Sequence, residues 1–172
     1  MKKGLIIVFG LLLLTSCQDE MKTGFIDNSK LINDYQKKKD IESDFEKKSD
    51  AFNKRVDSVR NSFQTQAMQI QTSDPNMAKK DTQEKMQALS QQFQSYQQRW
   101  QMEEQSLTKE GQTQIDTLIK EVRTFVKEYG KKNGYTYILG QNEAGSVLYG
   151  EDSKDLTKEI LDELNKTYKK KD

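Results

Sequence analysis

The chain has 172 residues, which favours one small domain. Hydrophobic residues make up 33% and charged residues 32%, with a formal net charge of +1, and this composition is typical neither of a compact globular protein nor of a strongly basic nucleic-acid binder. The chain has no histidine, the commonest general base and metal ligand, and its single cysteine excludes an intrachain disulfide and a cysteine-cluster zinc site. We therefore expect no metal, no cofactor and no nucleic-acid partner.

Residues 1–16 have the features of a lipoprotein signal peptide. Two lysines precede the apolar stretch Leu5–Leu14, which is too short to span a bilayer comfortably. The next residues, Leu14-Thr15-Ser16-Cys17, resemble the lipobox of bacterial lipoproteins, in which the cysteine is acylated and becomes the mature N-terminus. The alternative is an ordinary secretory signal that happens to contain Cys17. We predict lipid attachment at Cys17, followed by a linker over 17–21.

A short strand is predicted over residues 23–27, and Asn28 or Ser29 can cap the helix that follows. From Leu31 onward, two sets of positions recur at heptad spacing without a slip, and eight of the twelve residues are apolar. The sets are Leu31, Lys38, Phe45, Phe52, Val59 and Gln66, and Tyr35, Glu42, Ser49, Val56, Phe63 and Ile70. This narrow apolar seam is typical of a coiled coil.

The pattern breaks at residues 72–76, which contain the only proline. Asp74 as an N-cap, with Pro75 at the first helical position, predicts that a second helix starts here. Because the connection is short, the two helices are expected to be antiparallel neighbours. The sequence therefore predicts a helical hairpin over residues 29–133 with its tip near 72–76.

The second helix carries its own apolar seam, which resumes one residue late beyond Gly111 and should change the local winding there. Gly130 and Asn133-Gly134 are expected to end the helix. The seam residues are Met86, Leu89, Phe93, Tyr96, Trp100 and Leu107, then Ile115, Leu118, Val122, Phe125 and Tyr129.

After the hairpin, strands are predicted over residues 135–139 and 146–149, followed by a short amphipathic helix capped by Asp152 or Asp155. The predicted fold class is α+β and mostly α, in which residues 22–28 and 134–168 form a small β/α body. Because so small a core is marginal alone, we expect a homo-oligomer assembled through this body. The residues expected at its interface are Phe25, Ile26, Tyr137, Ile138, Leu139, Val147, Leu148 and Tyr149.

Two stretches resemble the ends of proteins of the Skp/OmpH family. They are Gly24-Phe25-Ile26-Asp27 with Lys30-Leu31 and Tyr35, and Tyr135 to Leu139 with Val147-Leu148-Tyr149, Asp155 to Leu161 and Leu164-Asn165. The resemblance covers about residues 22–166. It implies a jellyfish-shaped homotrimer in the periplasm of a Gram-negative bacterium, which holds unfolded outer-membrane proteins between its arms without ATP. The lipobox, which implies an anchor in the inner or outer membrane, and the nearly neutral charge depart from the best-known members, which are soluble and basic.

The distal part of the hairpin, residues 61–102, holds twelve glutamines and four of the six methionines. Met68, Met77 and Met102 lie off the seam, where flexible side chains suit loose binding of varied apolar segments; the alternative is that they are tolerated surface residues. Phe93, Tyr96 and Trp100 lie on the seam, so they are client-binding candidates that core packing could also explain. The prediction is a passive holdase.

An enzyme is not expected, because the sequence contains no GxxxxGK[ST], GxSxG, HExxH or CxxC motif. One alternative function is a structural lipoprotein that tethers or spaces the cell envelope, which would need a continuous rod. Another is an efflux-type adaptor, which would need further β domains beside the hairpin.

Overall fold

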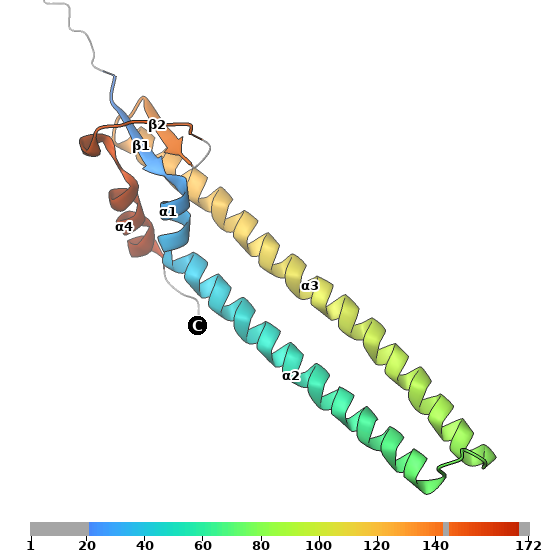
Figure 1. The fold of residues 1–172 in the computed structure, drawn as a ribbon. Helices are drawn as coiled ribbons and strands as arrows, with labels where there is room; N and C mark the ends of the chain where they lie inside the picture. The colour runs from blue at the N-terminus through green and yellow to red at the C-terminus, as the bar shows by residue number, and fades with distance from the viewer. Residues whose placement is uncertain (1–20, 143–144, 169–172) are drawn as a thin grey trace, which may run out of the picture.

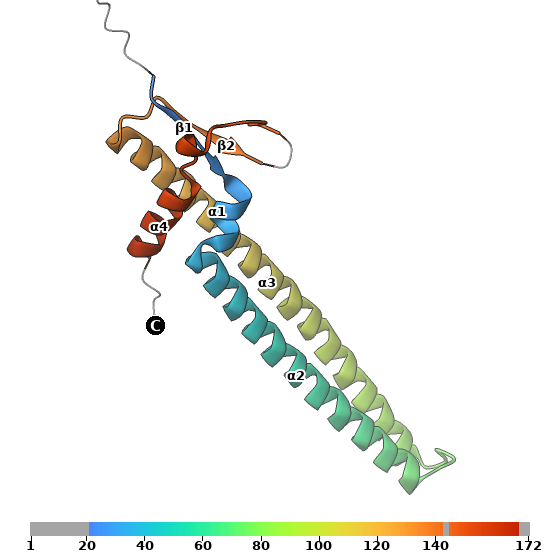
Figure 2. The same cartoon turned by 60° about the vertical axis from the view of Figure 1, so that its left-hand side comes forward.

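The computed structural model describes residues 21–142 and 145–168, and the predicted lipid attachment at Cys17 therefore lies outside it. A small body carries one long arm of two helices that lie side by side in both views (Figures 1 and 2). The elements in chain order are β1 (Thr23–Asp27), α1 (Asn28–Asp34), α2 (Gln36–Ser73), α3 (Lys80–Lys132), β2 (Tyr137–Gln141), the 3-10 turn η1 (Asp152–Lys154) and α4 (Thr157–Thr167). At 1.5 Å per residue, α2 is about 57 Å long and α3 about 80 Å.

The two ends of the chain meet in a two-stranded parallel sheet. β1 pairs with β2 so that Gly24 lies opposite Ile138 and Ile26 opposite Gly140. The strands are parallel because α2 leads away from the body, α3 returns past it, and the chain then turns back along β1 (Figure 1). The predicted helical hairpin is confirmed. The strand predicted over residues 135–139 is found two residues farther along, as β2.

The strand predicted over residues 146–149 is wrong. This stretch has no regular structure, and the side chains of Leu148 and Tyr149 are 91% and 85% exposed. One edge of β1 is paired with β2, and the other is occupied by the segment before α4, where the Leu156 amide donates to the Phe25 carbonyl at 2.8 Å. A third strand therefore has no free edge of β1 to pair with.

The hydrophobic core lies in the body and draws on four elements, β1, α1, α3 and α4, and on the residues that precede α2 and α4. Leu31, Leu118 and Ile160 are fully buried, and they come from α1, α3 and α4. The other members are Ile26, Tyr35, Val122, Leu156 and Leu164. The last turns of α3 are thus part of the body, and α3 runs from the core to the tip without a break.

The first long helix, in contrast, is interrupted at Tyr35. The sequence predicts one continuous helix from residue 29, but Tyr35 has an extended backbone (φ −65°, ψ 124°) and separates α1 from α2. The predicted cap is also wrong, because Asp27 rather than Asn28 or Ser29 accepts the hydrogen bond from the Lys30 amide. The aspartate side chain reaches the third amide of α1 at 2.9 Å, as an N-cap does.

The tip is longer than predicted, because α3 begins at Lys80 and not at Pro75. Asp74 is the C-cap of α2, Pro75 lies in the turn, and Met77 has a positive φ of 51°. The Asp74 carboxylate nevertheless accepts a hydrogen bond from the Lys79 amide at 2.8 Å. That bond is the main reason why the pKa of Asp74 lies below its ordinary value.

Candidate functional site

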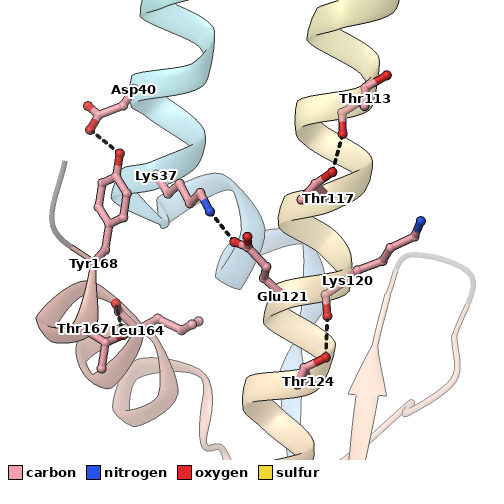
Figure 3. Close-up of polar contacts among 10 residues, drawn as sticks. All are labelled: Lys37, Asp40, Thr113, Thr117, Lys120, Glu121, Thr124, Leu164, Thr167 and Tyr168. Carbon is pink, nitrogen blue, oxygen red and sulfur yellow. Dashed lines mark hydrogen bonds and ion pairs between the residues drawn. The ribbon is translucent and has the colours of Figure 1, made fainter. Parts of the chain in front are cut away.

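The part of the arm nearer the body is joined by ion pairs between its two helices. Lys37 pairs with Glu121, Lys48 with Glu110, and Arg55 with Glu103 (the first pair is drawn in Figure 3). Every cation lies on α2 and every carboxylate on α3. A step of eleven or seven residues along α2 is matched by an equal step back along α3, so the pairs specify one antiparallel register. Because the side chains are largely solvated, each pair contributes at most about 1 kcal/mol.

Beyond Arg55 and Glu103 toward the tip, no ion pair joins α2 to α3 in the residues that the structure describes. Four aromatic side chains, which we call the aromatic cluster, lie between the helices there: Phe63, Phe93, Tyr96 and Trp100. The Phe63 ring is centred 5.2 Å from that of Phe93 and 5.5 Å from that of Tyr96, and Phe93 lies 5.9 Å from Trp100. Only Phe63 is buried, so three rings remain half exposed.

Two open grooves follow the arm. The distal groove has a volume of about 300 Å³ and lies beside the aromatic cluster, with Arg60, Phe63, Gln64, Leu89, Ser90 and Phe93 along its walls. The proximal groove has a volume of about 420 Å³ and lies closer to the body. It is lined by Lys38, Ile41, Glu42, Phe45, Thr108, Gly111, Gln112 and Ile115. Both expose mainly apolar side-chain atoms between polar rims.

The structure places the off-seam methionines on the surface of the distal arm. Met68 and Met102 are 69% and 63% exposed, and Met77 is partly buried in the turn at the tip. Met86, which the sequence assigns to the seam, is also partly buried. The predicted client-binding residues are therefore half-exposed rings between the helices, two exposed methionines outside them, and the partly buried Met77 at the tip.

The residues predicted for the body interface include both exposed and buried side chains. Tyr137 and Leu139 are exposed and, being two residues apart on β2, lie on one face of the strand. Leu148 and Tyr149 are also exposed, while Val147 is half-buried. Of the others, Ile26 is in the core and Ile138 packs against it, while Phe25 is partly buried on the opposite face of β1, close to Gly150.

Two features were not identified as functional from sequence. The first is the proximal groove, whose only sequence signal is the glycine at 111 opposite a seam phenylalanine at 45. The second is a set of contacts from the end of α4 to the start of α2, made by Asn165 and Tyr168. Asn165 is a polar residue of α4 and Tyr168 is the aromatic residue that directly follows this helix, and periodicity alone does not assign either of them a partner.

No group of three or more potential metal-ligating side chains occurs within residues 21–142 and 145–168. Burial and a hydrogen bond with Glu159 raise the pKa of Tyr129 above its ordinary value, so this phenol stays protonated. None of the described helices combines the length and the apolar composition needed to cross a membrane.

Comparison with known proteins gives a family and a fold. The model of the outer membrane protein (OmpH-like) family matches residues 22–164. The crystal structure of a candidate outer membrane chaperone (OmpH-like) from Caulobacter crescentus CB15 matches with a TM-score of 0.77 at 11% sequence identity, covering 88% of each chain. No curated protein matches the sequence significantly.

Proposed function

The chain belongs to the OmpH-like family of outer membrane proteins, and we propose that it is an ATP-independent chaperone that holds unfolded outer-membrane proteins in the periplasm. The fold is that of a protein described as a candidate outer membrane chaperone, and this likeness supports the proposal. The observation that carries it is the distal arm, where exposed methionines and half-exposed rings lie on a thinly packed helix pair.

The distal arm suits weak binding of varied apolar segments. Met68 and Met102 can each cover part of an apolar client side chain, whose full burial is worth about 1.5–3 kcal/mol. Methionine is unbranched and adapts to different shapes, so it does not select one sequence. Several such contacts along one arm add through their high effective concentration, while each remains weak enough to break.

We propose that three copies assemble through the body. Exposed Tyr137 and Leu139 lie on β2, and Leu148 and Tyr149 lie on the segment that follows it. Large apolar side chains in such number on a small body are typical of an interaction surface. When the three bodies are assembled, the arms extend away from them and enclose a space for the client.

The proposed membrane anchor is a lipid on Cys17, which precedes the body in the sequence. A lipid on Cys17 would keep Thr23 within about 20 Å of the bilayer, because six residues span no more than that when extended. Arms that start from the body then reach into the periplasm, where a client arrives unfolded. Acyl chains supply about 0.8 kcal/mol per buried CH₂.

Holding of this kind needs no nucleotide. Binding lowers the concentration of free unfolded client by mass action, and the client leaves when folding into a membrane offers it a larger gain in free energy. The arms can adapt to clients of different size because few side chains are buried between their helices. Such regions open locally at little cost in free energy.

The proposal is tested by the aggregation of a denatured outer-membrane β-barrel on dilution, without ATP. We expect the protein to suppress light scattering at one trimer per client, and a Met68→Ser, Met102→Ser variant to need several-fold more protein. The matched control is Gln69→Ser, Gln101→Ser, which changes adjacent exposed positions and should behave as wild type. If the wild-type protein leaves aggregation unchanged, the proposal is wrong.

The alternative of an envelope spacer predicts a continuous rod, which is not the fold observed. Both long helices return to one body, where Gly24 pairs with Ile138. The adaptor alternative requires additional β domains, and the described residues contain one two-stranded sheet. Neither alternative accounts for the exposed apolar side chains of the distal arm.

A further inference from the structure

The start of α2 is capped by a residue far away in the sequence. Tyr35, its own N-cap residue, offers no side-chain hydrogen bond to the first turn. The Gln36 amide instead donates to the side-chain oxygen of Asn165 on α4, at 3.0 Å and across 129 residues. A free helix start leaves its first amides without partners, so α4 supplies what the local sequence lacks.

Tyr168, immediately after α4, makes a second connection to the same turn. Its hydroxyl donates to the Asp40 carboxylate at 3.0 Å, and its ring meets that of Tyr35 edge to face at 5.8 Å (the Tyr168–Asp40 bond is drawn in Figure 3). Asp40 also accepts a hydrogen bond from the Gln36 side chain at 2.9 Å. Burial, with a smaller effect of Asp40, raises the pKa of Tyr168 to about 12, so the hydroxyl keeps its proton.

The two arm helices are attached to the body in different ways. α3 continues into the core through the buried residues Leu118 and Val122, whereas α2 follows the extended residue Tyr35 and contributes only the partly buried Ile41 at the edge of the core. The proximal groove begins one turn farther along α2, at Lys38 and Ile41. Any rotation of α2 about Tyr35 therefore changes the width of this groove.

We propose that the end of α4 is a strap that holds α2 against the body, with Asn165 and Tyr168 as the residues that position the arm. With the strap in place, the first turn of α2 is fixed and the proximal groove keeps its width. With the strap released, α2 pivots about Tyr35 and the groove opens. That the groove receives client segments rests on the proposed function, but the strap itself does not.

Ordinary core packing by α4 is the competing explanation, because Ile160 and Leu164 are buried in the body. Deleting α4 would remove both and unfold the body, so the test changes only the two strap side chains. Asn165→Ala removes the cap, Tyr168→Phe removes the hydroxyl while keeping the ring, and the double variant removes both. Lys166→Ala is the control, since Lys166 is exposed and pairs with Glu163 of the same helix.

The measurement is hydrogen exchange of the full-length chain, without client. In the double variant we expect the amides of residues 36–40 to exchange about fivefold faster or more, as for the loss of a helix cap. Residues 118–122 in the core and the Lys166→Ala variant should keep wild-type rates. The proposal is overturned if residues 36–40 keep their protection, or if the core accelerates equally, which would indicate general destabilisation.

The pivot is checked separately with one spin label on each arm helix near the proximal groove, at the exposed positions Glu46→Cys of α2 and Thr113→Cys of α3. The labels are placed in a Cys17→Ser background and the labelled chain is diluted with unlabelled chain. We expect a longer and broader label-to-label distance in the double variant than in the Lys166→Ala control. An unchanged distance would overturn the pivot. Because neither readout involves client, failure of the strap is distinguishable from failure of the holdase proposal.

Discussion

Phe45 of α2 lies with its ring against α3 at Gly111, where a Cβ atom would come within 3.0 Å of the ring carbon Cδ2. This is closer than an ordinary van der Waals contact, so only glycine admits the ring at its present position. The close approach forms one wall of the proximal groove. The seam of α3 shifts by one residue near this point, and the missing side chain makes room for the phenylalanine.

The contact predicts that substitutions of Gly111 and of Phe45 have coupled effects on the free energy of unfolding. Alanine in place of glycine inside a helix stabilises by about 0.5–1 kcal/mol, but here the ring must move outward to admit the methyl group. Phe45 is 39% exposed and can move, so we expect a smaller gain in the wild type than in a Phe45→Ala background. Denaturant unfolding at one protein concentration measures both; equal gains would show that the contact has no effect.

The ion pairs between the arm helices predict that exchanging the two charges of one pair preserves the stability of the protein. Arg55→Glu alone places two carboxylates together and should cost up to about 1 kcal/mol of unfolding free energy, and adding Glu103→Arg should recover most of it. Arg60→Glu is the control, because Arg60 pairs with Asp57 of the same helix and, among the described residues, with no carboxylate of α3. A double variant no more stable than Arg55→Glu would contradict the assigned pairing.

The tip is predicted to loosen in acid because of Asp74. Hydrogen bonding, chiefly from the Lys79 amide, lowers the pKa of this carboxyl in the folded protein. A depressed pKa stabilises the folded tip above the unfolded value near 3.8, and this stabilisation is lost as the pH falls through the folded value. Hydrogen exchange at residues 77–80 should accelerate over that window in the wild type. In Asp74→Asn the acceleration should be absent; if it persists, another group is responsible.

Alanine substitutions of two leucines are predicted to differ in their effects on stability and assembly. Leu118→Ala removes a fully buried side chain from the core and should cost about 2–5 kcal/mol of unfolding free energy. Leu148→Ala changes a side chain that is 91% exposed, so the stability of the single chain should stay within about 0.5 kcal/mol. If the body assembles as proposed, Leu148→Ala should also lower the oligomer fraction in analytical ultracentrifugation, and an unchanged fraction would exclude Leu148 from the interface.

The helices and their pairing were predictable because heptad spacing is local information. The seam from Leu31 to Ile70, with the break near Pro75, was sufficient to predict a hairpin that brings Ile26 and Ile138 into one body. The break at Tyr35 was not predictable in the same way. Tyr35 fits the seam, and the cap that the next helix uses comes from Asn165, 129 residues farther along the chain.

Two further errors have the same origin. Asp74-Pro75 is typical of a helix start, but the Asp74 carboxylate reaches the Lys79 amide, and α3 begins five residues after Pro75. Residues 146–149 have a strand-like composition, but they pair with neither strand, and the second edge of β1 is bonded to the segment at Leu156 instead. In each case the sequence indicates a local preference, and the choice of partner is decided by the folded chain.

Photo-cross-linking in living cells measures whether the distal arm holds unfolded outer-membrane proteins. A photoreactive residue in place of Met102, on the distal arm, should capture β-barrel proteins that mass spectrometry identifies as outer-membrane proteins. The same residue in place of Lys154, exposed on the body, should capture few. Equal capture at the two positions, or no barrel protein at Met102, would contradict the account.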